Sequence, residues 1–244
     1  MRFLANPHRF LTLSAAVLPW CAALTAALFA TGLYFALFAS PPDYQQGDSV
    51  RIMYVHVPAA WMAMMVYALL ALLAAASLVW RHPLADVMAK AAAPIGAGFT
   101  LIALVTGSLW GEPTWGTWWK WDARLTSVLV LFFLYLGHIA LTNAFDDATR
   151  GARAAAVLAL VGVVNLPIIK FSVEWWSTLH QPASILRLGA PTIHSSMLTP
   201  LFLMAAAFLG YFVCLLILRT RSELAARRLR ALRLLAADET GGAQ

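Results

Sequence analysis

The sequence predicts an all-α membrane protein with six transmembrane helices. Hydrophobic residues make up 61% of the 244 residues and charged residues only 11%, whereas about a quarter of an average soluble protein is charged. Six apolar stretches each supply the roughly 20 residues that a helix needs to cross hydrocarbon. They lack the alternating pattern of a membrane β-barrel. The predicted spans are residues 11–39, 52–79, 91–109, 125–145, 154–173 and 197–218.

The first apolar stretch, residues 11–39, is expected to remain as a membrane anchor. It is far longer than the roughly 7 to 15 apolar residues of a secretory signal peptide. No stretch of the sequence has the composition of a linker, a repeat or a second domain. We therefore expect residues 1–244 to form a single six-helix membrane domain.

The two cysteines, Cys21 and Cys214, both fall inside predicted spans. They form no C-x-x-C pair and no haem-attachment motif. We therefore expect both to be small core residues without thiol chemistry.

The basic residues indicate how the chain is threaded through the membrane, because short cytoplasmic loops collect Lys and Arg. Five of the seventeen fall in the loops and helix ends on the side opposite the termini: Arg51, Lys120, Arg124, Lys170 and Arg187. The other twelve fall on the side of the termini: Arg2, Arg9, Arg81, Lys90, Arg150, Arg153, Arg219, Arg221, Arg227, Arg228, Arg230 and Arg233. Both termini are therefore expected in the cytoplasm. This orientation explains most of the +6 charge, so no nucleic-acid partner is expected.

The arginine-rich tail, residues 218–237, mixes Arg with Leu and Ala at helical spacing. Two interpretations are open. The tail could be an amphipathic helix lying on anionic lipid, or it could be a solvated helix.

A tryptophan-rich loop, residues 110–124, is expected outside the membrane. It contains five tryptophans within twelve residues: Trp110, Trp115, Trp118, Trp119 and Trp121. With Trp175 and Trp176, seven of the ten tryptophans lie on this side. An ordinary aromatic belt decorates both interfaces, so the asymmetry favours a wall of indoles that stacks on a planar aromatic ligand.

Histidines supply the second part of such a site, because neutral imidazole commonly ligates haem iron. His56 and His180 lie on different outward segments and could approach opposite faces of one porphyrin. His194 is kept as a reserve ligand. His138 lies inside the fourth span, and we expect it to be a hydrogen-bonded helix-packing residue.

Three outward cations, Arg51, Lys120 and Arg124, could bind the two propionates of a porphyrin. Alternatively, they lie among lipid headgroups and pair with Glu112 or Asp122. Asp122 is expected to orient the loop by hydrogen bonds rather than to act as a ligand.

A resemblance sharpens this interpretation. Residues 115–127 read Trp-Gly-Thr-Trp-Trp-Lys-Trp-Asp-Ala-Arg-Leu-Thr-Ser and resemble the signature of the WWD haem-handling proteins. Three further motifs are similar to the haem exporter protein C family of cytochrome c maturation: Met-Tyr-Val-His56-Val-Pro-Ala-Ala, Val-Asn165-Leu-Pro-Ile-Ile and Ser-Val-Glu-Trp-Trp before His180. The resemblance covers about residues 51–181.

The resemblance implies that His56 and His180 are the two axial ligands of haem b, and that the tryptophan loop is its platform. It implies a bacterial inner-membrane protein that delivers haem at the periplasmic face to a periplasmic chaperone, protein E. Further implied partners are a small single-span subunit, protein D, and an ABC transporter of proteins A and B. The sequence lacks a G-x-x-x-x-G-K-[ST] phosphate loop, so a partner would hydrolyse ATP. No catalytic residue is expected.

Two other functions are weighed against this one. A quinone-linked cytochrome b would bury a bis-imidazole haem between helices, but His138 is the only histidine predicted at mid-span. A small-molecule permease would mark its path with polar or broken helices near the midplane. The chain offers chiefly Asn165 and Pro167 there, and these could equally serve helix packing.

Overall fold

The computed structural model describes residues 6–182, 184, 185, 187 and 189–241. Within these ranges the chain is almost entirely helical and has no strand. The α-helices are α1 (Pro7–Tyr34), α2 (Met53–Trp80), α3 (Ala85–Trp115), α4 (Ala123–Asn143), α5 (Ala148–Gly162), α6 (Asn165–Trp175) and α7 (Ser195–Gly241). A π-helical turn, Phe35–Ala39, extends α1, and a 3-10 turn, Asp48–Ile52, precedes α2.

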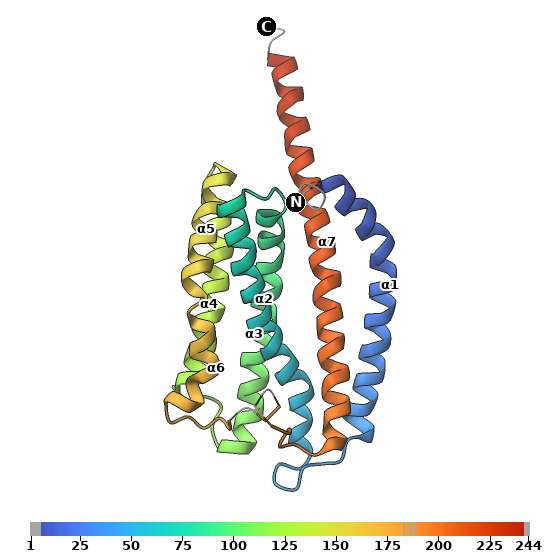
Figure 1. The fold of residues 1–244 in the computed structure, drawn as a ribbon, viewed down its shortest axis with the longest axis vertical. Coiled ribbons are helices and arrows are strands. Elements are labelled where there is room, and N and C mark those ends of the chain that lie inside the picture. The colour runs from blue at the N-terminus through green and yellow to red at the C-terminus, as the bar shows by residue number, and fades with distance from the viewer. Residues whose placement is uncertain (1–5, 183, 186, 188, 242–244) are drawn as a thin grey trace.

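Among the described residues, six helical segments are long and apolar enough to cross a membrane, which confirms the predicted fold class. They are Pro7–Ala39, Asp48–Trp80, Ala85–Trp115, Ala123–Asn143, Ala148–Trp175 and Ser195–Ala236. The fifth segment combines α5 and α6, which are separated by a short turn before Asn165. In Figure 1, α2 and α3 run through the middle of the bundle, α4 to α6 lie on one side, and α1 and α7 lie on the other.

The two ends of the bundle differ in their residues, and we name them accordingly. The tryptophan end carries residues 40–52, 110–122 and the described residues of the segment between α6 and α7, at the bottom of Figure 1. The terminal end lies opposite, where α1 begins and α7 leaves the bundle. All five basic residues that the sequence assigns to the outward side belong to the tryptophan end or to the helix turns next to it.

Helix α3 extends farther than the predicted span, which ended at residue 109. It continues to Trp115 and ends where Gly116 adopts a left-handed conformation with φ of 71°. Glycine accommodates such a conformation because it lacks a Cβ. The expected loop of residues 110–124 is therefore helical up to Trp115, and only residues 116–122 are irregular before α4 begins.

The polar residue of the fifth span contributes to helix packing. Asn165 is buried at the start of α6, and its Nδ2 donates a hydrogen bond of 2.8 Å to the carbonyl oxygen of Ser127 on α4. A buried amide is stable only when it is hydrogen-bonded. Of the two interpretations of Asn165, the contact favours the packing role over a transport path.

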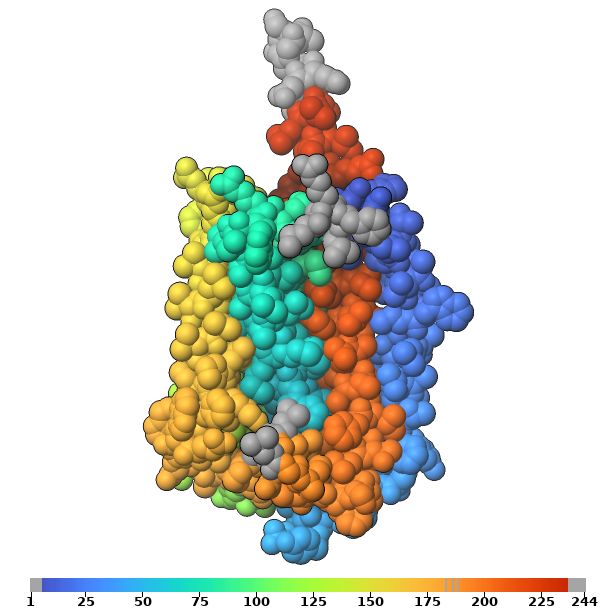
Figure 2. Space-filling model, in the orientation of Figure 1, coloured from blue at the N-terminus to red at the C-terminus, as the bar shows by residue number. Residues whose placement is uncertain are grey.

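The arginine-rich tail continues α7 as one helix through residue 241. Figure 2 shows the tail rising beyond the bundle rather than bending across it. Its first turns are tied to the terminal end by ion pairs from Arg227 to Asp86, at 2.7 Å, and from Glu223 to Lys90, at 3.1 Å. This geometry agrees with a solvated helix and not with a helix that lies flat on the lipid.

Candidate functional site

The predicted site residues come together at the tryptophan end from four parts of the chain. His56 lies in the first turn of α2, and Trp110 and Trp115 lie in the last turns of α3. Asp122 begins α4, and His180 lies in the segment after α6. The two histidines are near enough to interact electrostatically with each other and with Arg124.

His56 is held on α3 through its Nδ1 atom. Nδ1 lies 3.1 Å from the Thr106 hydroxyl, and that hydroxyl donates a 2.6 Å hydrogen bond to the Ile102 carbonyl oxygen. Because the hydroxyl has one proton, already donated, it must accept the proton of His56 Nδ1. The edge of the Trp110 indole lies against the imidazole, with ring centroids 5.7 Å apart.

Gly107 provides the room for this imidazole. A Cβ atom at position 107 would lie 3.0 Å from Cε1 of His56, closer than ordinary van der Waals contact. The glycine therefore lets α3 approach the ring. His56 is thus positioned by three residues of one helix face: Thr106, Gly107 and Trp110.

His180 is held by the carboxylate of Asp122. Its Nδ1 lies 3.3 Å from Oδ2 of Asp122, and the side chain of Asp122 is only 2% exposed. Oδ2 also accepts a 3.4 Å hydrogen bond from the backbone N–H of Leu179. The Trp115 indole contacts the His180 ring at a centroid distance of 4.8 Å. The loop that carries His180 is therefore fastened to the start of α4.

Burial lowers the pKa of the His180 imidazole from its usual value of 6.5. The Asp122 carboxylate opposes this effect, and the positive charge of Arg124 adds to it. The net lowering favours the neutral imidazole at neutral pH, which is the form that binds iron.

The hydrogen bonds assign the same tautomer to His56 and His180, and the opposite one to His194. In the first two, Nδ1 donates, so Nε2 keeps a lone pair. In His194, Nδ1 accepts a 3.3 Å hydrogen bond from the backbone N–H of Ser196, so its Nε2 carries the proton. His194 caps the first turn of α7, which leaves it poorly suited to the role of reserve ligand.

The tryptophans fall into two groups. Trp110 and Trp115 contact the histidines, and the indole N–H of Trp110 donates a 2.8 Å hydrogen bond to Gln46. Trp118 and Trp121 are exposed, at 58% and 73%. The Trp119 ring packs edge-on against Trp121, and its Nε1 is buried without a hydrogen-bond partner among the described residues.

The predicted cations differ in how firmly they are held. Arg124 is tied to α6, because its Nε donates to Ser172 Oγ at 3.2 Å and its terminal nitrogen to the Lys170 carbonyl at 3.4 Å. Arg51 pairs with Asp48, at 3.0 Å, rather than with Glu112 or Asp122. Lys120 is exposed. All three are at or beside the tryptophan end, which keeps them available for anionic groups.

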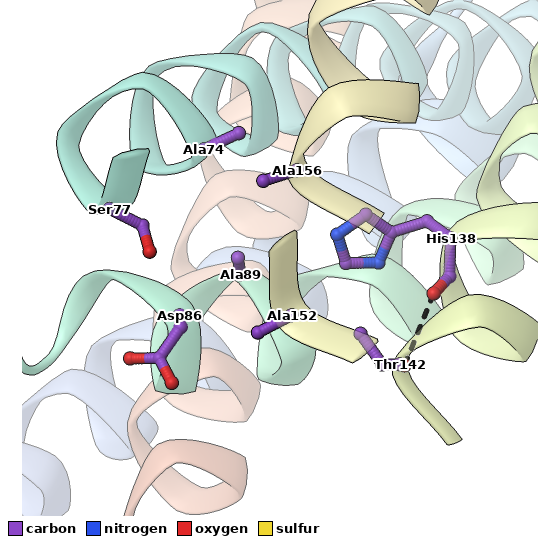
Figure 3. A pocket seen from close by; sticks show the side chains of 8 residues that line it. All are labelled: Ala74, Ser77, Asp86, Ala89, His138, Thr142, Ala152 and Ala156. Carbon is purple, nitrogen blue, oxygen red and sulfur yellow. Dashed lines mark hydrogen bonds between the residues drawn. The ribbon is translucent and has the colours of Figure 1, made fainter. Parts of the chain in front are cut away.

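A small cavity near the terminal end is lined in part by His138 (Figure 3). It is lined by Ala74, Ser77, Asp86, Ala89, His138, Thr142, Ala152 and Ala156. Its volume of about 10 Å³ has room for no more than about one water molecule. His138 is buried, and its Nδ1 has no hydrogen-bond partner among the described residues. The expectation of a hydrogen-bonded ring is wrong for this atom, and the cavity cannot hold a porphyrin.

Comparison with known proteins decides the family. Residues 1–235 match the family model described as "Heme exporter protein C". The chain belongs to the haem exporter protein C family.

Relatives in this family span bacteria and a plant mitochondrion. The heme exporter protein C of Bradyrhizobium diazoefficiens is 60% identical over 235 residues, covering 96% of this chain and 89% of the relative. That of Escherichia coli K12 is 49% identical over 219 residues, covering 90% and 88%. A ccmC-like mitochondrial protein of cytochrome c biosynthesis from Marchantia polymorpha is 50% identical over 194 residues, covering 80% and 82%.

In this member of the haem exporter protein C family, three residues that position the site were not predicted from the sequence. Thr106 accepts from His56, Gly107 makes room for it, and Gln46 binds the Trp110 indole. Thr106 and Gly107 lie one turn before Trp110 on a helix, and this spacing places them on one face. This helical spacing could not be used in the prediction, because residue 110 was assigned to a loop.

Proposed function

We propose that this protein binds haem b at the periplasmic face of the bacterial inner membrane and passes it to a periplasmic haem chaperone. His56 and His180 are the axial ligands in this proposal. The observation that carries it is the shared anchoring of the two imidazoles, each donating from Nδ1 to a fixed acceptor. Such outer hydrogen bonds orient metal-binding histidines and raise their basicity.

The surrounding residues match the other parts of a haem. Trp110 and Trp115 lie against the ligand rings, while Trp118, Trp119 and Trp121 extend the aromatic surface toward the bundle's end. Indole faces stack on flat π systems. Arg124, Arg51 and Lys120 supply positive charge for the propionates. Asp122 orients the site without binding the cargo.

The proposed side of the membrane follows from charge. Twelve of the seventeen basic residues belong to the termini and the loops of the terminal end. Short cytoplasmic loops are enriched in Lys and Arg, which supports a cytoplasmic terminal end and a periplasmic tryptophan end. The exposed indoles then face a soluble periplasmic partner.

The proposed partners are the chaperone, protein E, a small single-span subunit, protein D, and an ABC transporter of proteins A and B. The relatives are named as haem exporters, and this chain has no phosphate loop for ATP. The protein's own contribution would be to hold haem in an orientation suited to transfer. A resident cytochrome b is less well supported, because the cavity beside His138 is far too small for haem.

The test is the absorption spectrum of the purified full-length protein with haem, recorded before and after the addition of apo-chaperone. We expect a bis-imidazole spectrum that is lost as haem appears on the chaperone. The His194→Ala variant should behave like the wild type. A haem that stays on this protein and undergoes reversible redox cycling in the presence of chaperone would instead support the cytochrome.

A further inference from the structure

The two cysteines of the chain meet between the first and last helices. Cys21 lies on α1 and Cys214 lies on α7, and their sulfur atoms are 3.1 Å apart. The residues are separated by 193 positions in the sequence. The sequence predicts two small core residues without thiol chemistry, and the structure adds that their side chains are in contact.

The close approach is built into the helix backbones. Gly210 on α7 lies directly against Thr25 of α1, where a Cβ atom at position 210 would collide with the threonine hydroxyl. Cys21 Sγ is 3.8 Å from the Gly210 carbonyl oxygen, and Cys214 Sγ is 3.9 Å from Thr25 Oγ1. The two sulfurs are therefore close because small residues let α1 and α7 cross at short distance, and not because two long side chains extend toward each other.

Helix α1 is held in the bundle mainly by α7. It stands at the edge of the bundle and packs chiefly against α7 (Figure 1). Its buried residues are Ser14, Thr25 and Gly32, all of them small. At the terminal end, Arg221 of α7 donates hydrogen bonds to the Leu11 carbonyl, at 2.7 Å, and to Ser14 Oγ, at 2.8 Å.

We propose that Cys21 and Cys214 form a reversible intramolecular disulfide that clamps α1 to α7. A disulfide bond is about 2.05 Å long, so an approach of about 1 Å closes it. Two S–H bonds break and one S–S bond forms, which releases two protons and two electrons. A lipid-soluble quinone accepts both electrons and both protons and becomes the quinol. Cys21 is only half-buried, and α1 stands at the edge of the bundle, so a quinone dissolved in the bilayer can approach this helix.

The clamp acts away from the haem site. Cys21 and Cys214 lie in the interiors of α1 and α7, whereas His56 and His180 lie at the tryptophan end on other segments. Closing the bond therefore fixes the peripheral helix without changing the axial ligands. A cross-link that closes so long a loop restricts the unfolded chain strongly, and the oxidised protein should resist thermal unfolding better than the reduced one.

The experiment uses the full-length protein in lipid vesicles, first reduced and then treated with decyl-ubiquinone. After denaturation, free thiols are counted as gel shifts with a polyethylene-glycol maleimide. Because the chain has only two cysteines, we expect two additions per reduced chain and none after the quinone, restored by dithiothreitol. A protease digest should contain the peptides of Cys21 and Cys214 joined together.

Four variants make the outcome decisive. Cys21→Ser and Cys214→Ser should each keep one addition throughout. Gly210→Leu should force the helices apart and keep both thiols free, whereas Gly98→Leu, at a position with open space, should oxidise like the wild type. Two additions retained by the quinone-treated wild type would overturn the proposal. A disulfide-linked dimer in place of the internal bond would also overturn it.

Discussion

One oxygen of the Asp122 carboxylate faces His180 Nδ1 at 3.3 Å, while the other caps α4 by accepting from the Leu125 N–H at 2.7 Å. A single buried side chain thus joins the tryptophan segment, the start of a membrane helix and the loop that carries a proposed ligand. The aspartate of the WWD signature has a structural explanation here, since it fixes both the position and the tautomer of His180.

Replacing Asp122 by Asn should weaken haem binding by about 10- to 100-fold, the usual cost of losing the outer hydrogen bond of a metal-binding histidine. Asn keeps an oxygen for the Leu125 N–H, so its amide N–H₂ would face the N–H of His180. Haem titration followed by absorbance measures the effect. The control is Asp147→Asn, which removes the charge from another helix cap, the one that accepts from Thr149 at 2.8 Å. Equal affinities of the two variants would exclude a role for Asp122 in holding the ligand.

The variants His56→Ala and His180→Ala should each retain haem weakly and lose the bis-imidazole spectrum. Stacking on the tryptophans persists after one axial bond is lost, and added imidazole should fill the vacated position and partly restore the spectrum. His194→Ala should keep the wild-type spectrum, because the His194 ring caps α7. An unchanged spectrum for either of the first two variants would remove that histidine from the ligand set.

Thr106→Val should lower haem affinity by roughly tenfold, since valine has nearly the same shape as threonine but cannot accept the proton of His56 Nδ1. The matched control is Thr142→Val on α4, which also removes a hydroxyl bonded to a helix carbonyl, at 2.8 Å from Ile139 O. Affinities are compared by haem titration, and folding by thermal unfolding in detergent. Wild-type affinity in Thr106→Val would show that His56 needs no such acceptor.

The helices and the two candidate ligands could be predicted because each is marked by a pattern of neighbouring residues in the sequence. Six long apolar stretches cross a membrane whatever they pack against, and His56 and His180 stood beside recognisable motifs. The helical state of Trp110 was missed, because the apolar stretch ends at residue 109 although α3 continues through Gly111 and Pro113 to Trp115. The contact between Cys21 and Cys214 was also missed, because contacts between distant segments leave no periodic pattern. The free Nδ1 of His138 likewise depends on which neighbours surround it.

Reporter fusions should place the terminal end in the cytoplasm. A fusion after Arg150 or at the C-terminus should be active only as a cytoplasmic reporter, and one inserted after Gly116 only as a periplasmic reporter, because twelve of the seventeen basic residues are on the terminal side. A periplasmic signal from the Arg150 fusion would reverse the topology and remove the proposed haem site from the periplasm.

The exposed indoles should matter more for haem transfer to the chaperone than for haem binding. Trp118 and Trp121 are 58% and 73% exposed, and neither contacts His56 or His180 in the described hydrogen bonds and ring pairs. Replacing both by Ala should therefore leave the ligand spectrum intact. It should slow the appearance of covalent haem on the chaperone by about tenfold or more, because an aromatic contact contributes about 0.5 to 1.5 kcal/mol.

The matched control is Trp20→Ala on α1, which removes an indole that is 78% exposed but lies on a helix away from the site. Transfer is measured as haem-stained chaperone, normalised to the amount of folded protein in the membrane. A misplacement of about 1 Å can reduce a geometry-dependent step roughly a hundredfold, so the double variant should lose transfer while Trp20→Ala keeps it. Normal loading by the double variant would mean that Trp118 and Trp121 only anchor the protein at the membrane surface, and that the chaperone approaches the haem from another side.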